Sequence, residues 1–267
     1  MDKPTTAILA RTNRALMPLE GALSAAGVPF FYINKSGFFA QTEVKAVLSY
    51  LGCCLYTADY LLAGSIRAPF FPTKFLPKTK LLASLKEHHT EEESYWSLLV
   101  NKPSLLVEHK NLGSVSEFVQ FVSSLRRYKD LPASEATKQV LSALKAVDYY
   151  SQEESSPDSD PVENLVTLVK IAGRFSSIKE FLDYARKVTA ASKKKSGVAL
   201  STLHSAKGLE FDTVYLVQCS EGMLPHAKST DLESERNCFF VGCSRAERKL
   251  VITYSGQPSG FLKKETK

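Results

Sequence analysis

The densest group of chemically capable residues runs from Ser201 to Phe211, with the sequence Ser-Thr-Leu-His-Ser-Ala-Lys-Gly-Leu-Glu-Phe. It places hydroxyl, imidazole, ammonium and carboxylate groups between two apolar runs, 198–203 and 213–217, that the pattern predicts to be buried strands. Loops that follow the core strands of α/β proteins commonly hold phosphate and nucleic-acid contacts. A plain strand–turn–strand crossing fits short fragments of the stretch. It does not account for the whole stretch together with Glu-Gly-Met-Leu-Pro-His at 221–226 and Arg-Ala at 245–246.

The sequence lacks the loop that normally cradles a nucleotide triphosphate. No Gly-x-x-x-x-Gly-Lys-Ser/Thr pattern occurs, and no acidic metal-binding strand end replaces it. Lys207-Gly208 is followed by Leu209 and has no glycine five residues upstream, so it is not a disguised version of that loop. We therefore predict that this polypeptide alone binds neither ATP nor Mg²⁺ and has no ATPase activity.

Composition bounds the class of protein. The chain has 267 residues, 44% of them apolar, which is enough for one large domain or two modest ones with packed cores. The net charge of +6 suits an anionic partner without demanding one. No apolar run reaches transmembrane length, and the N-terminus lacks the profile of a signal peptide. We expect a soluble, cytoplasmic protein with no membrane partner.

Five cysteines, at 53, 54, 219, 238 and 243, show no zinc-ligand spacing with a matching histidine. We expect them to be buried free thiols in a reducing compartment, and we expect no bound metal.

The elements that must position these residues alternate at the start of the chain. A strand at 5–10 is followed by a helix at 16–26, which Gly27 closes, and then by a strand at 29–33. A further helix is predicted at 42–55. This alternation is typical of a parallel α/β layer.

The middle of the chain reads as helical. Apolar residues recur at helical spacing in six windows, and strand-like alternation is scarce. The acidic, serine-rich segment 151–160 has the composition of a mobile loop. Lys193-Lys194-Lys195 suits either a phosphate contact or a solvated linker. The predicted helices are 79–88, 92–100, 115–128, 134–150, 161–172 and 177–191.

The α/β pattern returns at Ser196. Thr230 and Glu233 form a capping box that predicts the start of a helix, which ends near Arg245. A strand is expected at 250–254, followed by a polar tail. The two ends of the chain thus build one α/β domain, and a helical domain is inserted between them.

Three blocks of residues carry a family resemblance. Residues 6–13 (Thr-Ala-Ile-Leu-Ala-Arg-Thr-Asn) resemble motif IV of the UvrD/PcrA/Rep family of superfamily 1 DNA helicases. Residues 202–211 resemble its motif V, and 233–246 its motif VI. Ala10 stands where the family usually has an aromatic residue, and Ser244 replaces the common threonine.

The resemblance implies a fold. It implies a RecA-like parallel-sheet domain, with the fold of P-loop NTPases but no P-loop, that carries an all-helical insert. The second motor domain would comprise 1–62 and 196–258, the helical accessory domain 63–195, and a flexible tail 259–267.

The resemblance also implies roles for single residues. Arg11 and Arg245 would be the catalytic arginines that reach the γ-phosphate, because a planar guanidinium stabilises charge on the transferring phosphoryl group. Gly208 and Glu210 would complete the nucleotide contacts. The DNA-binding residues would be Thr202, His204 and His226.

Each role has a structural alternative. Arg11 could form an ion pair, and Arg245 could complement a helix dipole. His204 and Glu210 could hold the loop itself. Glu235 and Arg236 read more naturally as a structural ion pair than as catalytic groups.

The resemblance implies a function that this chain performs in part. It would be the C-terminal motor portion of an ATP-dependent 3′–5′ DNA helicase. It would bind single-stranded DNA or a single-strand/duplex junction, and it would use ATP and Mg²⁺ only with an N-terminal ATP-binding motor domain, in cis or in trans. The alternative is a stand-alone, non-enzymatic module that binds DNA or docks onto a helicase.

Overall fold

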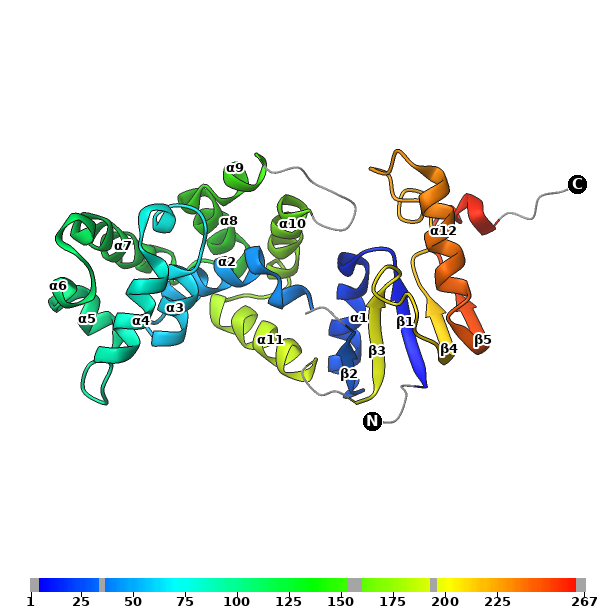
Figure 1. Ribbon diagram of the computed structural model, residues 1–267, viewed down its shortest axis with the longest axis horizontal. Helices are drawn as coiled ribbons and strands as arrows, with labels where there is room; N and C mark the ends of the chain where they lie inside the picture. Colours follow the sequence, from blue (N-terminus) through cyan, green and yellow to red (C-terminus); the bar gives the residue numbers. More distant parts are fainter. Residues whose placement is uncertain (1–4, 34–36, 153–159, 193–195, 263–267) are drawn as a thin grey trace, which may run out of the picture. The chain divides into compact units, whose positions relative to one another are not determined.

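The structure, a computed structural model, describes residues 5–33, 37–152, 160–192 and 196–262. The chain divides into two compact units (Figure 1). We call Met1–Gln41, Ser155–Asp160 and Ala185–Lys267 the sheet unit, and Thr42–Glu154 with Pro161–Tyr184 the helical unit. In the described part of the chain, no helix is long and apolar enough to cross a membrane.

The sheet unit is built on five parallel strands in the order β2-β3-β1-β4-β5. β3, which follows the helical segment in the sequence, lies between β1 and β2 in the sheet (Figure 1). This order confirms a parallel α/β sheet made by both ends of the chain. β5 begins four residues before the predicted strand. The strands are β1 (Thr6–Ala10), β2 (Phe30–Tyr32), β3 (Val198–Thr202), β4 (Phe211–Leu216) and β5 (Ala246–Ile252).

Two helices cover the sheet. α1 (Asn13–Ala25) packs on β1 and β3, and α12 (Leu232–Cys243) packs on β4 and β5. The connections β1–α1–β2 and β4–α12–β5 run in opposite directions across the sheet, so right-handed crossovers place the helices on opposite faces, as Figure 1 shows. Side chains that alternate along the strands, such as Ala7, Leu9 and Val214, form the core beneath α12.

The ends of α1 follow from its sequence. The Thr12 hydroxyl accepts a hydrogen bond from the backbone N–H of Ala15 (3.3 Å) and caps the first turn. Gly27, at φ +68°, ends the helix as predicted. The N–H of Val28 donates to the carbonyl of Leu23 (2.9 Å), which satisfies a terminal carbonyl in a Schellman turn.

The helical unit has no strand among its described residues. Each predicted helix of the middle segment has a counterpart, but the prediction 134–150 is broken at Lys145, which adopts a left-handed φ of 51°. α3 and α6 were not predicted, because so few residues give little periodicity. The helices are α2 (Thr42–Cys53), α3 (Asp59–Ile66), α4 (Lys78–His88), α5 (Tyr95–Asn101), α6 (Pro103–Leu106), α7 (Leu112–Ser124), α8 (Ala133–Leu144), α9 (Ala146–Tyr150), α10 (Pro161–Ala172) and α11 (Ile178–Ala191), which crosses the boundary of the units.

The boundaries of the units differ from the predicted 62/63 and 195/196. α2 belongs to the helical unit because it packs on α3, α8 and α10. The first residues of the predicted tail 259–267 pack on the sheet unit. Ser259 is buried, and the centroid of the Phe261 ring lies 5.7 Å from that of Phe239. Most of the predicted loop 151–160, Lys193–Lys195 and residues 263–267 lie outside the described residues.

Glu20, buried on α1, gives a prediction for stability. It accepts hydrogen bonds from the Tyr32 hydroxyl and the Phe38 backbone N–H. Burial raises the pKa of Glu20 from 4.5 to about 7, although these hydrogen bonds oppose the rise. The folded protein therefore holds this proton to a higher pH than the unfolded chain does. The contribution of Glu20 to stability is full below pH 4.5 and falls as the pH rises toward 7.

Glu20→Gln should remove this dependence, which amounts to roughly 3 kcal/mol between pH 4.5 and 7.5. Urea unfolding of both proteins at several pH values measures it. Equal pH slopes for the variant and the parent protein would contradict the assignment.

Candidate functional site

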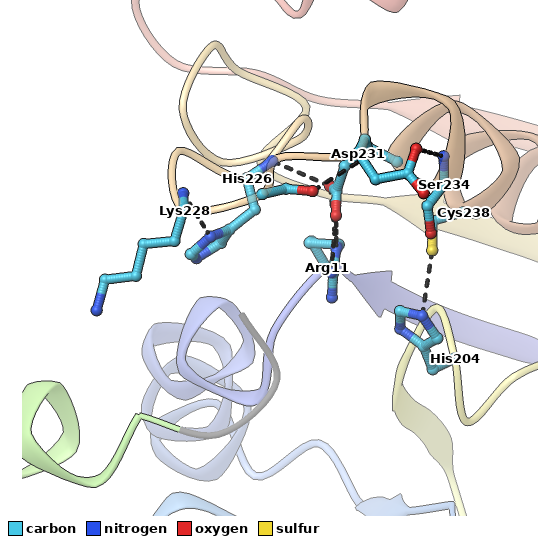
Figure 2. Close-up of polar contacts among 9 residues, drawn as sticks. Arg11, His204, His226, Lys228, Asp231, Ser234 and Cys238 are labelled. Carbon is cyan, nitrogen blue, oxygen red and sulfur yellow. Dashed lines mark hydrogen bonds and ion pairs between the residues drawn. The ribbon is translucent and has the colours of Figure 1, made fainter. Parts of the chain in front are cut away.

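An ion pair links the end of β1 to the start of α12 (Figure 2). Arg11 directly follows β1, and its Nε lies 3.0 and 3.1 Å from the two carboxylate oxygens of Glu235. Its Nη2 lies 2.7 Å from Oε1. The two side chains are only 6% and 2% exposed. Arg11 and Glu235 thus form a buried, two-pronged pair between residues 224 positions apart.

Glu235 also fixes the loop that precedes α12. Its Oε2 accepts a hydrogen bond from the backbone N–H of His226 (2.9 Å). Burial raises the pKa of Glu235, but the Arg11 hydrogen bonds and the His226 N–H outweigh it and hold the pKa below the usual value. Glu235 is therefore a carboxylate at neutral pH that ties three segments together.

His226 is a structural histidine in this arrangement. Its Nδ1 accepts a hydrogen bond from the backbone N–H of Lys228 (3.2 Å), and the residue is 8% exposed. Burial, reinforced by the charge of Arg11, lowers the pKa of His226. The ring is therefore neutral at pH 7, with its proton on Nε2.

The segment 203–210 connects β3 to β4 without a helix. It begins at the carboxyl edge of the sheet, where the N–H of Leu203 donates to the carbonyl of Ala10 (2.9 Å), and ends at the amino edge, where β4 starts. Thr202 shapes its first turn: the Ser205 N–H donates to the Thr202 Oγ1 (3.4 Å). Leu203 and Ala206 are buried in the core, which anchors the segment to the sheet.

His204 points outward from this segment. The residue is exposed, and its Nε2 lies 3.3 Å from the Cys238 Sγ on α12 (Figure 2). Cys238 is one helical turn beyond Glu235, so His204 belongs to the same edge of the sheet as the ion pair.

Arg245 lies at the amino edge. Its Nε donates to the Val241 carbonyl (3.0 Å) and its Nη1 to the Leu209 carbonyl (2.9 Å). Nη2 donates to the hydroxyl of Ser244 (3.0 Å), so two of its five N–H groups have no partner among the described residues. Beside it, Gly208 has φ +84° with open space around it, and Glu210 is exposed.

The predicted site residues therefore fall into two sets. Eight positions along α12 separate Glu235 from the last helical residue, Cys243, which is about 12 Å along the helix axis, and Arg245 lies two residues beyond that end. Arg11 and Arg245, which are both predicted to reach the γ-phosphate, follow β1 and precede β5 and so lie at opposite edges of the sheet. The carboxyl-edge set is Arg11, Thr202, His204 and His226, and the amino-edge set is Gly208, Glu210 and Arg245.

Burial describes the surroundings of several of these residues. Arg11 forms a buried ion pair with Glu235, the structural alternative named for it, and its γ-phosphate contact stays a prediction. Thr202 and His226 are 3% and 8% exposed, and both side chains accept hydrogen bonds from backbone N–H groups of their own loops. Glu235 pairs with Arg11 and not with the exposed Arg236.

Sequence reasoning also missed two features of α12. Asp231, not Thr230, caps the helix by accepting from the Ser234 N–H (3.0 Å). Glu235 lies three and four residues before Cys238 and Phe239, which pack on the core, so its spacing could have indicated burial.

Two further expectations concern metals and thiols. Among the described residues, no three His, Cys, Asp or Glu side chains gather to hold a metal ion. All five cysteines are free thiols, but Cys238 and Cys243 are half-buried, since α12 has one face toward solvent.

Comparison with known proteins gives consistent matches. A model of the UvrD-like helicase C-terminal domain matches residues 1–257. DNA helicase II of Escherichia coli (strain K12) is 31% identical over 270 residues, which cover 93% of this chain and 37% of that protein. The ATP-dependent DNA helicase srs2 of Schizosaccharomyces pombe is 28% identical, with 96% and 32% covered. The ATP-dependent DNA helicase PcrA of Bacillus subtilis is 26% identical, with 92% and 36% covered. The chain thus spans about a third of the length of these relatives.

Arg11→Ala should destabilise the sheet unit by about 3–5 kcal/mol, because it leaves the Glu235 carboxylate buried without its cation. Chemical unfolding measures the change. Arg236→Ala, at the exposed neighbouring position, is the matched control and should change stability by less than about 0.5 kcal/mol. Equal effects of the two substitutions would show that the buried pair is not a main support of this edge.

Proposed function

The chain belongs to the family of UvrD-like helicase C-terminal domains, and from this membership we propose that it is the second motor portion of an ATP-dependent 3′–5′ DNA helicase. The observation that carries the proposal is the arrangement at the carboxyl edge: the buried Arg11–Glu235 pair fixes two loops, and His204 lies exposed against Cys238 of α12. In this account the domains correspond to the sheet unit as motor domain and the helical unit as accessory domain.

Single-stranded DNA binds at the carboxyl edge in this proposal. His204 offers an exposed imidazole that can stack on a base or donate to a phosphate. Thr202 and His226 act indirectly, because their hydrogen bonds hold the loops on either side. The positive charge of the chain favours the same partner.

The nucleotide approaches the amino edge. Arg245 has two N–H groups to offer a phosphate oxygen, and the open space at Gly208 allows close approach of a ligand. Glu210 can accept a hydrogen bond from a ribose hydroxyl. ATP and Mg²⁺ would be held chiefly by an N-terminal motor domain, which supplies the triphosphate loop that this sequence lacks.

The segment 203–210 couples the two ligands. Its anchors at Leu203 and Ala206 are buried, and its two ends lie at opposite edges of the sheet. A shift at the nucleotide end is therefore transmitted to His204, because a packed segment moves as a unit.

The sheet unit exposes large apolar side chains near its C-terminal end, and these side chains suit a docking face for the N-terminal motor domain. Phe240 on α12 is 69% exposed, and Tyr254 beyond β5 is 57% exposed. Large exposed aromatic side chains commonly mark interaction surfaces.

His204→Ala should weaken binding of single-stranded DNA by about fivefold or more, the effect of losing one stacking or phosphate contact. Fluorescence titration at low and moderate salt measures it. His109→Ala, an exposed histidine of the helical unit, should leave the affinity unchanged. Equal losses in both variants would place the DNA elsewhere. DNA binding that depends on His204, together with no stimulation of any motor domain, would favour the stand-alone DNA-binding or docking module.

The purified chain should hydrolyse no ATP. Joined to an N-terminal motor domain, it should complete the ATPase, and Arg245→Ala should lower turnover by about 100-fold or more. A steady-state assay with and without DNA measures this. Arg236→Ala is the comparison: a loss with that variant alone would move the phosphate contact to the start of α12. Turnover by the isolated chain that depends on Arg245 would contradict the proposal that the triphosphate site lies elsewhere.

A further inference from the structure

α12 carries a thiol that the proposed function does not use. The Cys238 Sγ lies 3.3 Å from the His204 Nε2, a short contact for sulfur, and the two residues are 34 positions apart (Figure 2). His204 is exposed and Cys238 is half-buried, so small molecules in solvent can reach the pair. The pair is thus created by tertiary structure and is accessible.

A ring nitrogen lies within hydrogen-bonding distance of the Cys238 thiol. His204 faces the thiol from the segment 203–210, and an imidazole nitrogen at this position can accept the thiol proton, which leaves the thiolate and an imidazolium. The nearest carboxylate on its own helix, Glu235, is neutralised by Arg11 and points toward that arginine. The carboxylate one helical turn from Cys238 is therefore paired with a cation and does not repel a negative charge on the sulfur.

The other cysteines differ from Cys238. Burial raises the pKa of Cys53 to about 11 and those of Cys54 and Cys219 to about 12. Cys243 is half-buried on the same helix, and burial raises its pKa as well. These four thiols serve as internal controls, because thiols and not thiolates prevail there at neutral pH.

We propose that Cys238, paired with His204, is a modification site for hydroperoxides and soft electrophiles. The thiolate attacks one oxygen of a hydroperoxide, so an S–O bond forms and the O–O bond breaks. The sulfur is oxidised by two electrons to a sulfenic acid, and the peroxide is reduced. The leaving hydroxide or alkoxide takes the proton of the His204 imidazolium and departs as water or an alcohol.

Modification has a consequence that rests on the proposed function. A sulfenic acid or a larger adduct on Cys238 separates His204 from its partner on α12. The segment proposed to meet DNA then loses this support, so oxidation should weaken single-strand binding. The reactivity of the thiol does not depend on that role and can be tested without DNA.

The test is site-resolved mass spectrometry of the whole chain after brief treatment with iodoacetamide across pH 6–9, and separately with hydrogen peroxide plus a sulfenic-acid trap. Cys238 should be carboxamidomethylated at pH 7 about tenfold or more faster than Cys243, the rise expected when the thiolate fraction grows by one pKa unit. His204→Gln should cut the rate at Cys238 by a similar factor and shift its pH profile upward, without changing the rate at Cys243. The trap should label Cys238 first.

An unchanged rate at Cys243 and at buried Cys219 shows that the His204→Gln protein remains folded. The proposal is overturned if Cys238 reacts no faster than Cys243, or if His204→Gln leaves its rate and pH profile unchanged. If the thiol behaves as expected but its modification leaves DNA binding intact, the modification site stands and the role of His204 in DNA binding falls.

Discussion

The carboxyl edge of the sheet depends on one buried carboxylate. Glu235 holds Arg11 at the end of β1 through three short contacts and holds the backbone of His226 through a fourth. A buried charge is costly unless it is fully compensated, so these partners must stay in place together. His204 lies exposed at the same edge, against Cys238 of α12. The pair therefore positions the loops, and loss of either partner would destabilise this edge.

The second constraint is the length of α12. The helix spans the sheet from edge to edge, so residues at its two ends serve different surfaces. This separates Glu235 from Arg245 and divides the motif residues into a carboxyl-edge set and an amino-edge set. The segment 203–210 also runs from the carboxyl edge of the sheet, at the end of β3, to the amino edge, at the start of β4. Ala206, near its middle, is buried in the core. Two packed elements thus join the surface proposed for DNA to the surface proposed for the nucleotide.

Local patterns predicted much of the fold. Periodicity located β1, α1, the α10 helix and the helical character of the middle segment, and Gly27 marked the end of α1 correctly. Short helices such as α3 were not predicted. The helix predicted at 134–150 is interrupted at Lys145, although its apolar pattern continues through that residue. The site was less predictable. The motifs named residues near both edges, but the partner of Arg11 lies 224 positions away, and burial of Thr202 and His226 depends on packing that no local spacing encodes.

Hydrogen–deuterium exchange of the chain with and without single-stranded DNA tests the central claim that the two edges serve different ligands. Exchange should become slower at the backbone amides of residues 203–207 and 226–231 when DNA is bound. It should change little at 208–211 and 244–247, where the nucleotide is proposed to approach. Protection by DNA of the amino-edge segments, with none at 203–207, would contradict the account.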